Sequence, residues 1–458
     1  MDAVKVVSFF DRCVEEMTMS KLGNVVARDD IQSSIRPFNI LPGYKVTYPE
    51  GVIQAFAALY REYNRAFTPL VEANREWDSD YQWCVGRSGE LANWGVQIDM
   101  VGLPQAFLDG ATNMPVSAVV EILRRRIFEI ENSLAMYHML EMLFSDGQKD
   151  SFFKVRFRAT LADLRRQFNR PIALLAVTDS KYAAMKAIEF GRENGASLSD
   201  AEVQTLSGFD RFFGPEEFRR HVEENRGRCE YLLYARTSDP VAKLKDPTLH
   251  IDQPLLSNPM MRRIIKAHTL TMNVDTPGIA YGRINDTKEY MPALGMAFRA
   301  HAEADLLSPR LAAHLSVGGM YADFKGAQLS DEFASFLTSH GIDSTGDAPL
   351  RAKPLKGAYG CYGHVTGPLK DNRFRQELRR NFRRRGEYVI QPEMATPTIM
   401  NETDGMVYNY IDRVFFGMIG GRPEFLGGVR SMMPVESVEA QSGRNHGNTA
   451  TVSGEIIA

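Results

Sequence analysis

The sequence predicts a multidomain α/β protein whose first third is mainly helical. Three observations support that class. Apolar residues recur at helical spacing before residue 170. At Pro171 the chain begins a pattern typical of a buried strand, which is followed by a helical pattern. The final quarter contains β-type runs that are interrupted by glycines. At 458 residues the chain is long enough for two or three domains. We expect a helical N-terminal region at 1–170, an α/β domain at 171–285 and a third domain at 286–458.

The composition is ordinary for a globular protein. Hydrophobic residues make up 44% and charged residues 24% of the chain, and no stretch approaches the roughly 20 apolar residues of a membrane span. The net charge of −3 gives no general attraction to nucleic acid or to an anionic membrane. Residues 1–19 lack the basic and then apolar layout of a secretion signal. We therefore expect a cytoplasmic protein without membrane or nucleic-acid partners, and a homo-oligomer is compatible with the sequence.

The cysteines and histidines indicate no metal centre of their own. The four cysteines are widely scattered, which excludes a paired-cysteine zinc site and favours free thiols. The histidines, including His250, His314 and His364, form no pair at ligand spacing. Structural or surface roles are therefore expected for them.

Helical patterns dominate residues 1–170. Val52–Arg75 has long apolar and charged runs without breakers, and Val116–Ser145 repeats apolar residues every three or four positions. The second pattern predicts one packing face of a helix. Residues 84–95 between them form a polar, glycine-bearing loop, which either connects helices, the preferred interpretation, or enters a binding cleft.

The pattern changes at Pro171. Pro171–Val177 is a continuous apolar run followed by a polar cap and a helical segment, which together predict a βα unit. A second strand is predicted at Tyr231–Ala235, with a helix at Pro215–Asn225 before it. Two such units indicate a small parallel sheet, whose strand ends usually face a ligand crevice.

The strongest functional signal lies at residues 351–363. A short apolar stretch leads to Lys353 and is followed by a loop with three spaced glycines. Glycines let backbone amides approach an anion closely and a lysine adds positive charge, so the composition suits a nucleotide phosphate tail, although a simple turn is the alternative. The predicted phosphate contacts are Lys353, Lys356, Gly357, Gly360 and Gly363. For a second, upstream lysine three candidates stay open, namely Lys266, Lys288 and Lys325.

Further elements follow this loop in a recognisable order. They are a strand ending in acceptors at Tyr388–Glu393, strands that carry arginines, and an Asn- and Gly-rich turn at Ser442–Thr449. The order resembles the C-terminal half of an ATP-grasp enzyme, especially the branch around eukaryotic-type glutathione synthetase and glutathionylspermidine synthetase. The resemblance covers residues 345–458 well, 171–300 loosely, and none of the first 170 residues. It implies an ATP-grasp domain at 286–458 preceded by a pre-ATP-grasp domain with a small parallel sheet.

The resemblance also implies cofactors and roles. ATP and Mg²⁺ are the expected cofactors, with Gln391 or Glu393 at the adenine, although Pro392 removes a backbone donor from that hinge. The predicted magnesium ligands are Asp412, Asn445 and Asn448, with Glu436, Glu439 and Glu455 nearby. The arginines suited to an acyl phosphate or a substrate carboxylate are Arg413, Arg430 and Arg444.

An arginine-rich run stands between these elements. Asn372–Arg385 carries seven arginines, with Phe374, Leu378 and Phe382 at helical spacing. Basic residues with aromatics are typical of nucleic-acid binding, but here the apolar residues share one stripe. We therefore favour a helix anchored by that stripe, with solvated arginines.

The expected activity is an ATP-dependent carboxylate–amine ligase that forms an amide or peptide bond through an acyl phosphate. An amino acid or another small carboxylate, together with an amine, would be its substrates. The absence of an evident Ser/His/Asp or Cys/His constellation agrees with this chemistry. Two alternatives remain open, namely an ATP-dependent phosphotransferase and a non-catalytic ATP-binding regulatory protein.

Overall fold

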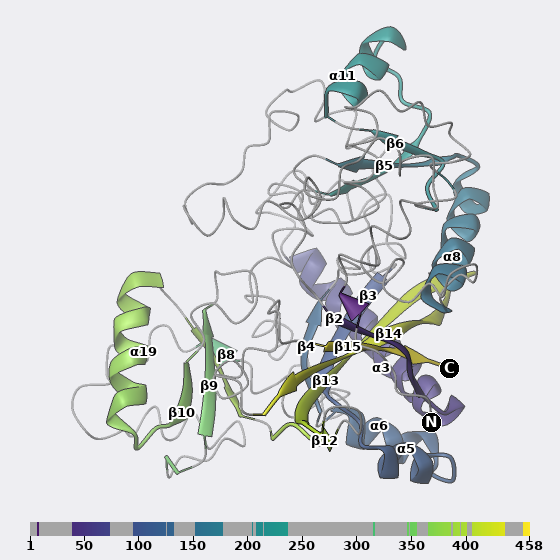
Figure 1. Cartoon of the computed structure of the whole chain (residues 1–458). Coiled ribbons are helices and arrows are strands. Elements are labelled where there is room, and N and C mark those ends of the chain that lie inside the picture. Colours follow the sequence, from purple (N-terminus) through teal and green to yellow (C-terminus); the bar gives the residue numbers. More distant parts are fainter. Residues whose placement is uncertain are drawn as a thin grey trace.

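A computed structural model describes the chain in segments: residues 7–8, 39–73, 95–124, 126–131, 152–176, 204, 208–213, 215–236, 315–316, 346–347, 349–354, 365–385, 388–393, 395–400, 405–435 and 452–458. Within these segments the strands form three separate sheets, and helices pack against them (Figure 1). The prediction of an α/β protein is thus confirmed at the level of class.

The central sheet joins strands from both ends of the chain. Its strand order is β1-β2-β15-β14-β13-β3-β4, and β12 pairs with β13 beside this path. The bounds are Val7–Ser8 (β1), Asn39–Thr47 (β2), Gly95–Val101 (β3), Ile127–Glu131 (β4), Thr398–Met400 (β12), Val407–Ile419 (β13), Arg422–Pro434 (β14) and Val452–Ile457 (β15). The pairing of β15 with β2 is parallel and the other pairs are antiparallel, so the sheet is mixed.

One face of the central sheet packs against helix α3 (Glu50–Ala73), which confirms the helix predicted at Val52–Arg75. Val52, Phe56 and Tyr60 recur every four residues and are fully buried. The rings of Phe56 and Tyr60 lie 6.0 and 6.1 Å from the ring of Phe416 on β13. Burial of such large side chains contributes about 1.5–3 kcal/mol each, so this contact is a main part of the core.

The helix predicted across Val116–Ser145 is wrong at residues 127–131, and residues 132–145 lie outside the described residues. Helix α6 spans Val116–Arg124, and the chain then forms strand β4 at Ile127–Glu131. The run from Ile127 to Glu131 alternates apolar and acidic residues, and its register pairs Ile130 with Ile98 of β3. Pairing with an existing strand therefore overrides the helical spacing of the isoleucines. Helix α5 (Gln105–Ala111) precedes α6 on the same side of the sheet.

Helix α8 (Phe152–Phe168) packs on the opposite face of the central sheet. Its Phe153 ring meets the Phe415 ring of β13 edge-on at 5.8 Å. Farther along the helix, Thr160 lies so close to Gly417 that a Cβ at that glycine would be only 3.2 Å from the Thr160 methyl group. The two faces of β13 are therefore both covered, by α3 on one side and by α8 on the other.

A small parallel sheet follows α8 and confirms the parallel sheet predicted for this region. Strand β5 (Ile172–Ala176) lies between β6 (Arg211–Phe213) and β7 (Leu232–Arg236) and is parallel to both. Helix α11 (Pro215–Glu224) packs on it through Phe218 and Val222, which are buried. The helix predicted after Val177 lies outside the described residues.

The third sheet is antiparallel, with strand order β10-β9-β11-β8. Its strands are β8 (Leu315–Ser316), β9 (Pro349–Pro354), β10 (Val365–Pro368) and β11 (Tyr388–Pro392), and helix α19 (Asn372–Arg385) connects β10 to β11. Phe374 and Leu378 of α19 are buried, which confirms these two positions of the predicted apolar stripe, and the side chain of Phe382 lies outside the described residues. Arg373 and Arg380 are exposed as predicted, but Arg375 is buried and donates to Asn372, so the prediction of solvated arginines is wrong at that position.

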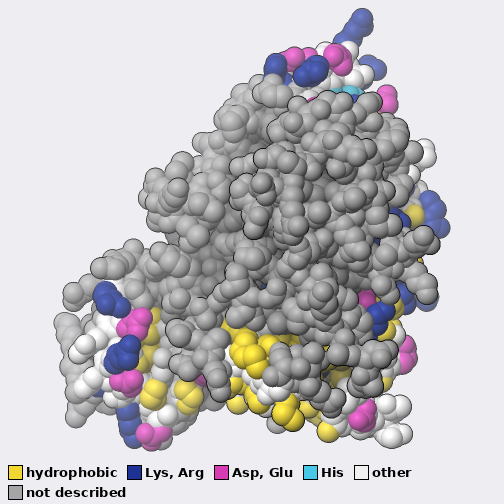
Figure 2. All heavy atoms as spheres, viewed as in Figure 1, with side chains coloured by type: hydrophobic (Ala, Val, Ile, Leu, Met, Phe, Trp, Pro, Cys, Tyr) yellow, Lys and Arg dark blue, Asp and Glu magenta, His cyan; other side chains and the backbone are white. Residues whose placement is uncertain are grey.

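Some hydrophobic side chains are exposed near strand β12. Figure 2 shows hydrophobic side chains gathered on the lower part of the molecule, where Figure 1 places β12. Met400 of β12 and Met406 just before β13 are both exposed. In the described part of the chain, no helix is long and apolar enough to cross a membrane.

Candidate functional site

Lys353, the leading candidate for a phosphate contact in the sequence, occupies the penultimate position of β9. The register pairs Lys353 with Val389 of β11 and pairs Arg351 with Gln391. Strand β9 ends at Pro354, and the chain returns as β10 at Val365. The predicted loop residues Lys356, Gly357, Gly360 and Gly363 fall between these strands, outside the described residues.

Successive residues of β9 lie on opposite faces of its sheet. Leu350 and Ala352 are buried, and the partner of Leu350 is Gly367, where a Cβ would lie 3.0 Å from Phe374 of α19. Those positions therefore belong to the face that α19 covers. Lys353 alternates with them, so its backbone position lies on the opposite face, together with the position of Gln391. The strand pairing thus brings two predicted cofactor-binding positions to one side of this sheet.

Glu393 is held on this sheet by Arg351, for which no role was predicted from the sequence. Arg351 donates from Nε to Glu393 Oε2 and from Nη2 to Oε1, both at 2.6 Å. The two side chains are partly buried, and the Glu393 backbone N–H donates to the Pro349 carbonyl at 2.9 Å. A two-point Arg–carboxylate contact fixes both side chains. The spacing of 42 residues between them gives no local sequence signal for the pair.

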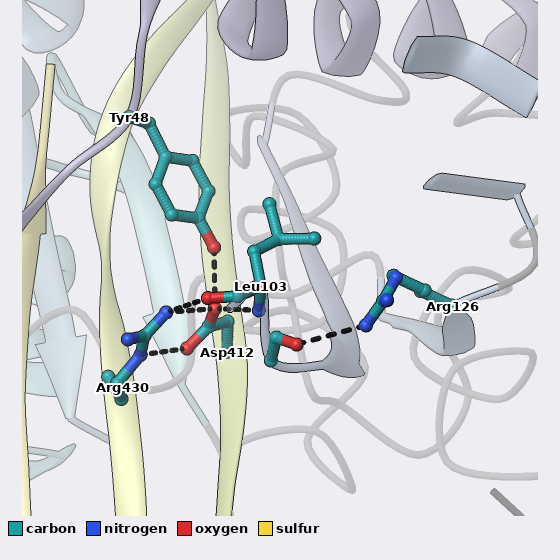
Figure 3. A network of polar contacts seen from close by, with 6 residues as sticks. Tyr48, Leu103, Arg126, Asp412 and Arg430 are labelled. Carbon is teal, nitrogen blue, oxygen red and sulfur yellow. Dashed lines mark hydrogen bonds and ion pairs between the residues drawn. The ribbon is translucent and has the colours of Figure 1, made fainter. Parts of the chain in front are cut away.

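Asp412 and Arg430 form a buried ion pair on the central sheet (Figure 3). Arg430 donates from Nε to Asp412 Oδ1 at 2.7 Å and from Nη2 to Oδ2 at 2.9 Å. Oδ2 also accepts from the Tyr48 hydroxyl at 2.7 Å and from the Leu103 backbone N–H at 2.8 Å. Arg430 Nη2 donates to the Leu103 carbonyl at 2.8 Å, and the guanidinium lies over the Tyr410 ring at 4.2 Å from its centroid.

This network explains the pKa shifts of its members. Burial raises the pKa of Tyr48 well above 10.0, and the neighbouring Asp412 charge adds to the rise. Burial by itself lowers the pKa of Arg430, but the charge and hydrogen bonds of Asp412 raise it, and the net shift is upward. Arg430 is therefore always charged, and both oxygens of Asp412 are engaged by donors of the protein. Asp412 shares a face of β13 with Phe416, the face that packs on α3.

The opposite face of the central sheet carries a line of charged residues across neighbouring strands. Arg413 of β13 pairs in register with Asp99 of β3 and with Val429 of β14. Val429 pairs with Glu455 of β15, which pairs with Lys45 of β2. Cross-strand partners share a face, so Lys45, Glu455, Arg413 and Asp99 form one row, which we name the charged row. Asp99, Arg413 and Glu455 are buried, and Lys45 is half exposed.

The contacts along the charged row differ in strength. Asp99 Oδ1 accepts from Gln97 Nε2 at 2.8 Å, whereas Asp99 Oδ2 lies 3.7 Å from Arg413 Nε. Glu455 Oε1 accepts from the Phe152 backbone N–H at 3.1 Å, and Oε2 lies 3.6 Å from Lys45 Nζ. Burial raises the pKa of Glu455, and Lys45 only partly offsets that effect.

Arg413 was predicted from the sequence as a site residue and Glu455 as lying near the magnesium ligands, whereas Gln97 and Asp99 were not predicted. A usable signal was present, because Gln97 and Asp99 alternate with apolar Ile98 and Met100, the pattern of a strand with one polar face. The remaining predicted site residues, Arg444, Asn445 and Asn448, lie outside the described residues, as do the three alternative lysines. Among the residues that are described, no group of three His, Cys, Asp or Glu side chains is close enough to hold a metal ion.

Comparison with known proteins assigns no family to this chain. No protein-family model matches it, and no curated protein matches it either. The function therefore has to be inferred from the chain's own residues.

Proposed function

We propose that the chain is an ATP-dependent carboxylate–amine ligase of the ATP-grasp type. The observation that carries the proposal is the position of Lys353 near the end of β9, on the sheet face opposite α19, which also carries the β11 position of Gln391. The glycine-containing loop begins directly after this strand. A cation, a row of backbone donors and an acceptor strand are what a nucleotide triphosphate needs.

The arrangement of the C-terminal sheets is in accord with the proposal. The β8–β11 sheet with α19 would hold the nucleotide phosphates, and the arginine-bearing strands β13 and β14 of the central sheet would hold the carboxylate substrate. Residues 393–397 connect β11 of the first of these sheets to β12 of the central sheet. In this arrangement ATP and the carboxylate substrate would be bound by two different sheets.

The proposed reaction has two steps. A carboxylate oxygen takes the γ-phosphoryl group of ATP, and ADP leaves. The amine nitrogen then attacks the acyl carbon and loses a proton, and inorganic phosphate departs with the electrons of the C–O bond. Lys353 would stabilise the transferred phosphoryl charge, and Arg413 would orient the carboxylate through charge-assisted hydrogen bonds.

Magnesium, when bound, would neutralise phosphate charge in such a site. Asn445 and Asn448 would supply amide oxygens for it. Asp412 already accepts four hydrogen bonds from Arg430, Tyr48 and Leu103, so a metal ion could reach its oxygens only by displacing these donors. We therefore assign the protein's own share of the chemistry to the lysine and the arginines.

The test is release of ADP and phosphate from ATP with panels of amino acids and amines, offered singly and in pairs. A ligase releases inorganic phosphate in step with amide formation, and only when acid and amine are both present. A phosphotransferase would instead form ADP and a stable phosphorylated product with one acceptor alone. Nucleotide binding without turnover under every condition would favour the regulatory alternative, and failure to bind ATP would overturn the proposal.

A further inference from the structure

Helix α11 contacts the small parallel sheet through the ring of His221, which lies in its last turn. The ring centroid of His221 lies 5.0 Å from that of Phe213 on β6 and 5.8 Å from that of Tyr231, just before β7. The rings of Phe213 and Tyr231 are themselves 5.5 Å apart and meet edge to face. His221 thus belongs to an aromatic cluster that holds the end of α11 on the sheet, beside β6 (Figure 1).

Asn225 determines which nitrogen of this ring carries a hydrogen. Its Nδ2 donates to the His221 backbone carbonyl at 2.7 Å, and a carbonyl can only accept, so the NH₂ group of the amide must face this turn of the helix. The same Nδ2 lies 3.3 Å from His221 Nδ1. Nδ1 is therefore the acceptor for the second N–H of the amide, and the hydrogen of the neutral ring is on Nε2.

The other nitrogen of the ring is shielded from solvent. Among the described residues, Nε2 of His221 has no hydrogen-bond acceptor. A charged imidazole is a donor at both nitrogens and needs an acceptor or water at each of them. In this arrangement a hydrogen on Nδ1 would meet an N–H of Asn225, so the packing suits the neutral ring and opposes the charged one.

The charged groups around the ring do not reverse this preference. Burial is the largest cause that lowers the pKa of His221 below its ordinary 6.5, and the positive charge of Arg211 on β6 lowers it further. Glu217 and Glu224 of α11 and Glu230 before β7 act in the opposite direction, but the net shift is downward. Glu224 and Glu230 are exposed, so solvent screens their charges.

We propose that His221 is a pH-sensitive switch that keeps α11 docked on the small parallel sheet while its ring is neutral and releases the helix when the ring is protonated. Phe218 and Val222 are buried under the docked helix, so release in acid uncovers an apolar surface. None of the predicted site residues lies on this sheet, and the inference is therefore independent of the ligase proposal.

The direction of the pH dependence follows from the shift. Because the folded-state pKa of His221 is lowered, the docked form binds fewer protons than the released form between that pKa and 6.5. The contribution of His221 to docking is therefore fully present above about pH 6.5 and is lost as the pH falls towards the folded-state pKa. A single proton changes the docking equilibrium by at most about tenfold per pH unit in this window.

The test is amide hydrogen exchange of the full chain, without ligands, between about pH 5 and about pH 8. After correction for the intrinsic pH dependence of exchange, peptides that cover α11 should lose protection below about pH 6.5, by up to about tenfold per pH unit. Peptides from α3 should keep their protection over the same range. If α11 stays protected at low pH, or if α3 and α11 lose protection together, the inference is wrong.

A ring that cannot titrate identifies the group responsible. His221→Phe keeps an aromatic ring between Phe213 and Tyr231 and removes both nitrogens, so α11 should stay protected over the whole range. The NMR signal of the His221 ring, identified by its absence in this variant, should titrate with a pKa below 6.5 in the wild type. A pH dependence that survives in His221→Phe, or a His221 pKa of 6.5 or higher, would overturn the inference.

A second variant reverses the effect without altering the ring. Asn225→Asp replaces the N–H donor by a carboxylate, which accepts from a hydrogen on Nδ1 and raises the pKa of His221, so acid should no longer release α11. Asn169→Asp is the matched control, because Asn169 follows the last residue of α8 as Asn225 follows that of α11, and both are exposed. It should keep the wild-type pH profile. A wild-type profile in Asn225→Asp as well would contradict the proposed switch.

Discussion

Arg430 and Asp412 face each other across β14 and β13 in direct register, and the guanidinium holds both carboxylate oxygens at 2.7 and 2.9 Å. Each residue is at most 2% exposed. A buried pair of this kind adds little net stability as a whole, but the loss of one partner leaves the other charged and unpaired.

Asp412→Asn should therefore destabilise the protein by about 3–5 kcal/mol in urea-induced unfolding, because Arg430 stays charged at every accessible pH. The double variant Asp412→Leu with Arg430→Met should recover part of that loss, because it removes both buried charges but leaves the Tyr48 hydroxyl and the Leu103 backbone groups without these partners. Tyr48→Phe, which removes one hydrogen bond, should cost only about 1–2 kcal/mol. If the Asp412→Asn protein were as stable as the wild type, the Asp412–Arg430 ion pair would not stabilise the pairing of β13 with β14.

Gly102→Ala should destabilise the chain by about 1–3 kcal/mol. A Cβ at Gly102 would overlap the ring of Tyr410, which is buried beneath the Arg430 guanidinium and has little space to move. Gly110→Ala is the control, because a Cβ there has no atom within 4 Å and alanine favours the α5 helix. Equal unfolding midpoints for the two variants would contradict the close contact at Gly102.

Lys353→Ala should reduce ATP-dependent turnover at least about hundredfold, the usual effect of removing one preorganised charge from a phosphoryl-transfer site. Circular dichroism and the unfolding midpoint should stay unchanged. Lys370→Ala provides the comparison, since Lys370 lies just after β10 and is largely exposed in an ion pair with Asp347. Full activity of Lys353→Ala would remove the phosphate assignment.

Glu393→Gln should affect stability more than nucleotide affinity. Its carboxylate accepts two hydrogen bonds from Arg351, so the substitution should cost about 1–2 kcal/mol in unfolding free energy. A double-mutant cycle with Arg351→Met would isolate this coupling. Gln391→Ala, in contrast, should weaken nucleotide binding measured by calorimetry; a larger loss of affinity in Glu393→Gln would assign the adenine contact to Glu393 instead.

Glu455→Gln should raise stability at neutral pH and not at low pH. Burial raises the folded-state pKa of Glu455 above its ordinary 4.5, so the folded protein binds the extra proton between 4.5 and the raised value. The stability contribution of Glu455 is therefore fully present below pH 4.5 and is lost as the pH rises through the folded-state pKa. Glutamine mimics the protonated form and still accepts from Phe152. The midpoint difference between variant and wild type should therefore grow with pH, and a constant difference would contradict the shift.

Local elements of this fold could be predicted because their signals are local. The long apolar and charged run without breakers predicted α3, and the stripe of Phe374 and Leu378 predicted α19. Strand β4 was missed because its isoleucines also satisfy helical spacing, and only pairing with β3 decides between the two.

The site was harder to predict because its contacts join distant segments. Asp412 and Arg413 are adjacent in a strand whose two faces are both buried, so no polar alternation indicates which residue faces α3. The partners Tyr48, Leu103 and Asp99 come from more than 300 residues earlier in the chain. Nothing in the local sequence of β13 specifies them.

The parallel pairing of β2 with β15 has a consequence for biosynthesis. Ile456 lies opposite Val46, so one long edge of β2 has no partner in the sheet until the ribosome has made more than 400 further residues. An exposed strand edge of this kind is a site for wrong association, and its late closure makes assembly of the central sheet slow. We therefore expect this chain to depend on chaperones during synthesis more than a protein whose paired strands are close together in the sequence.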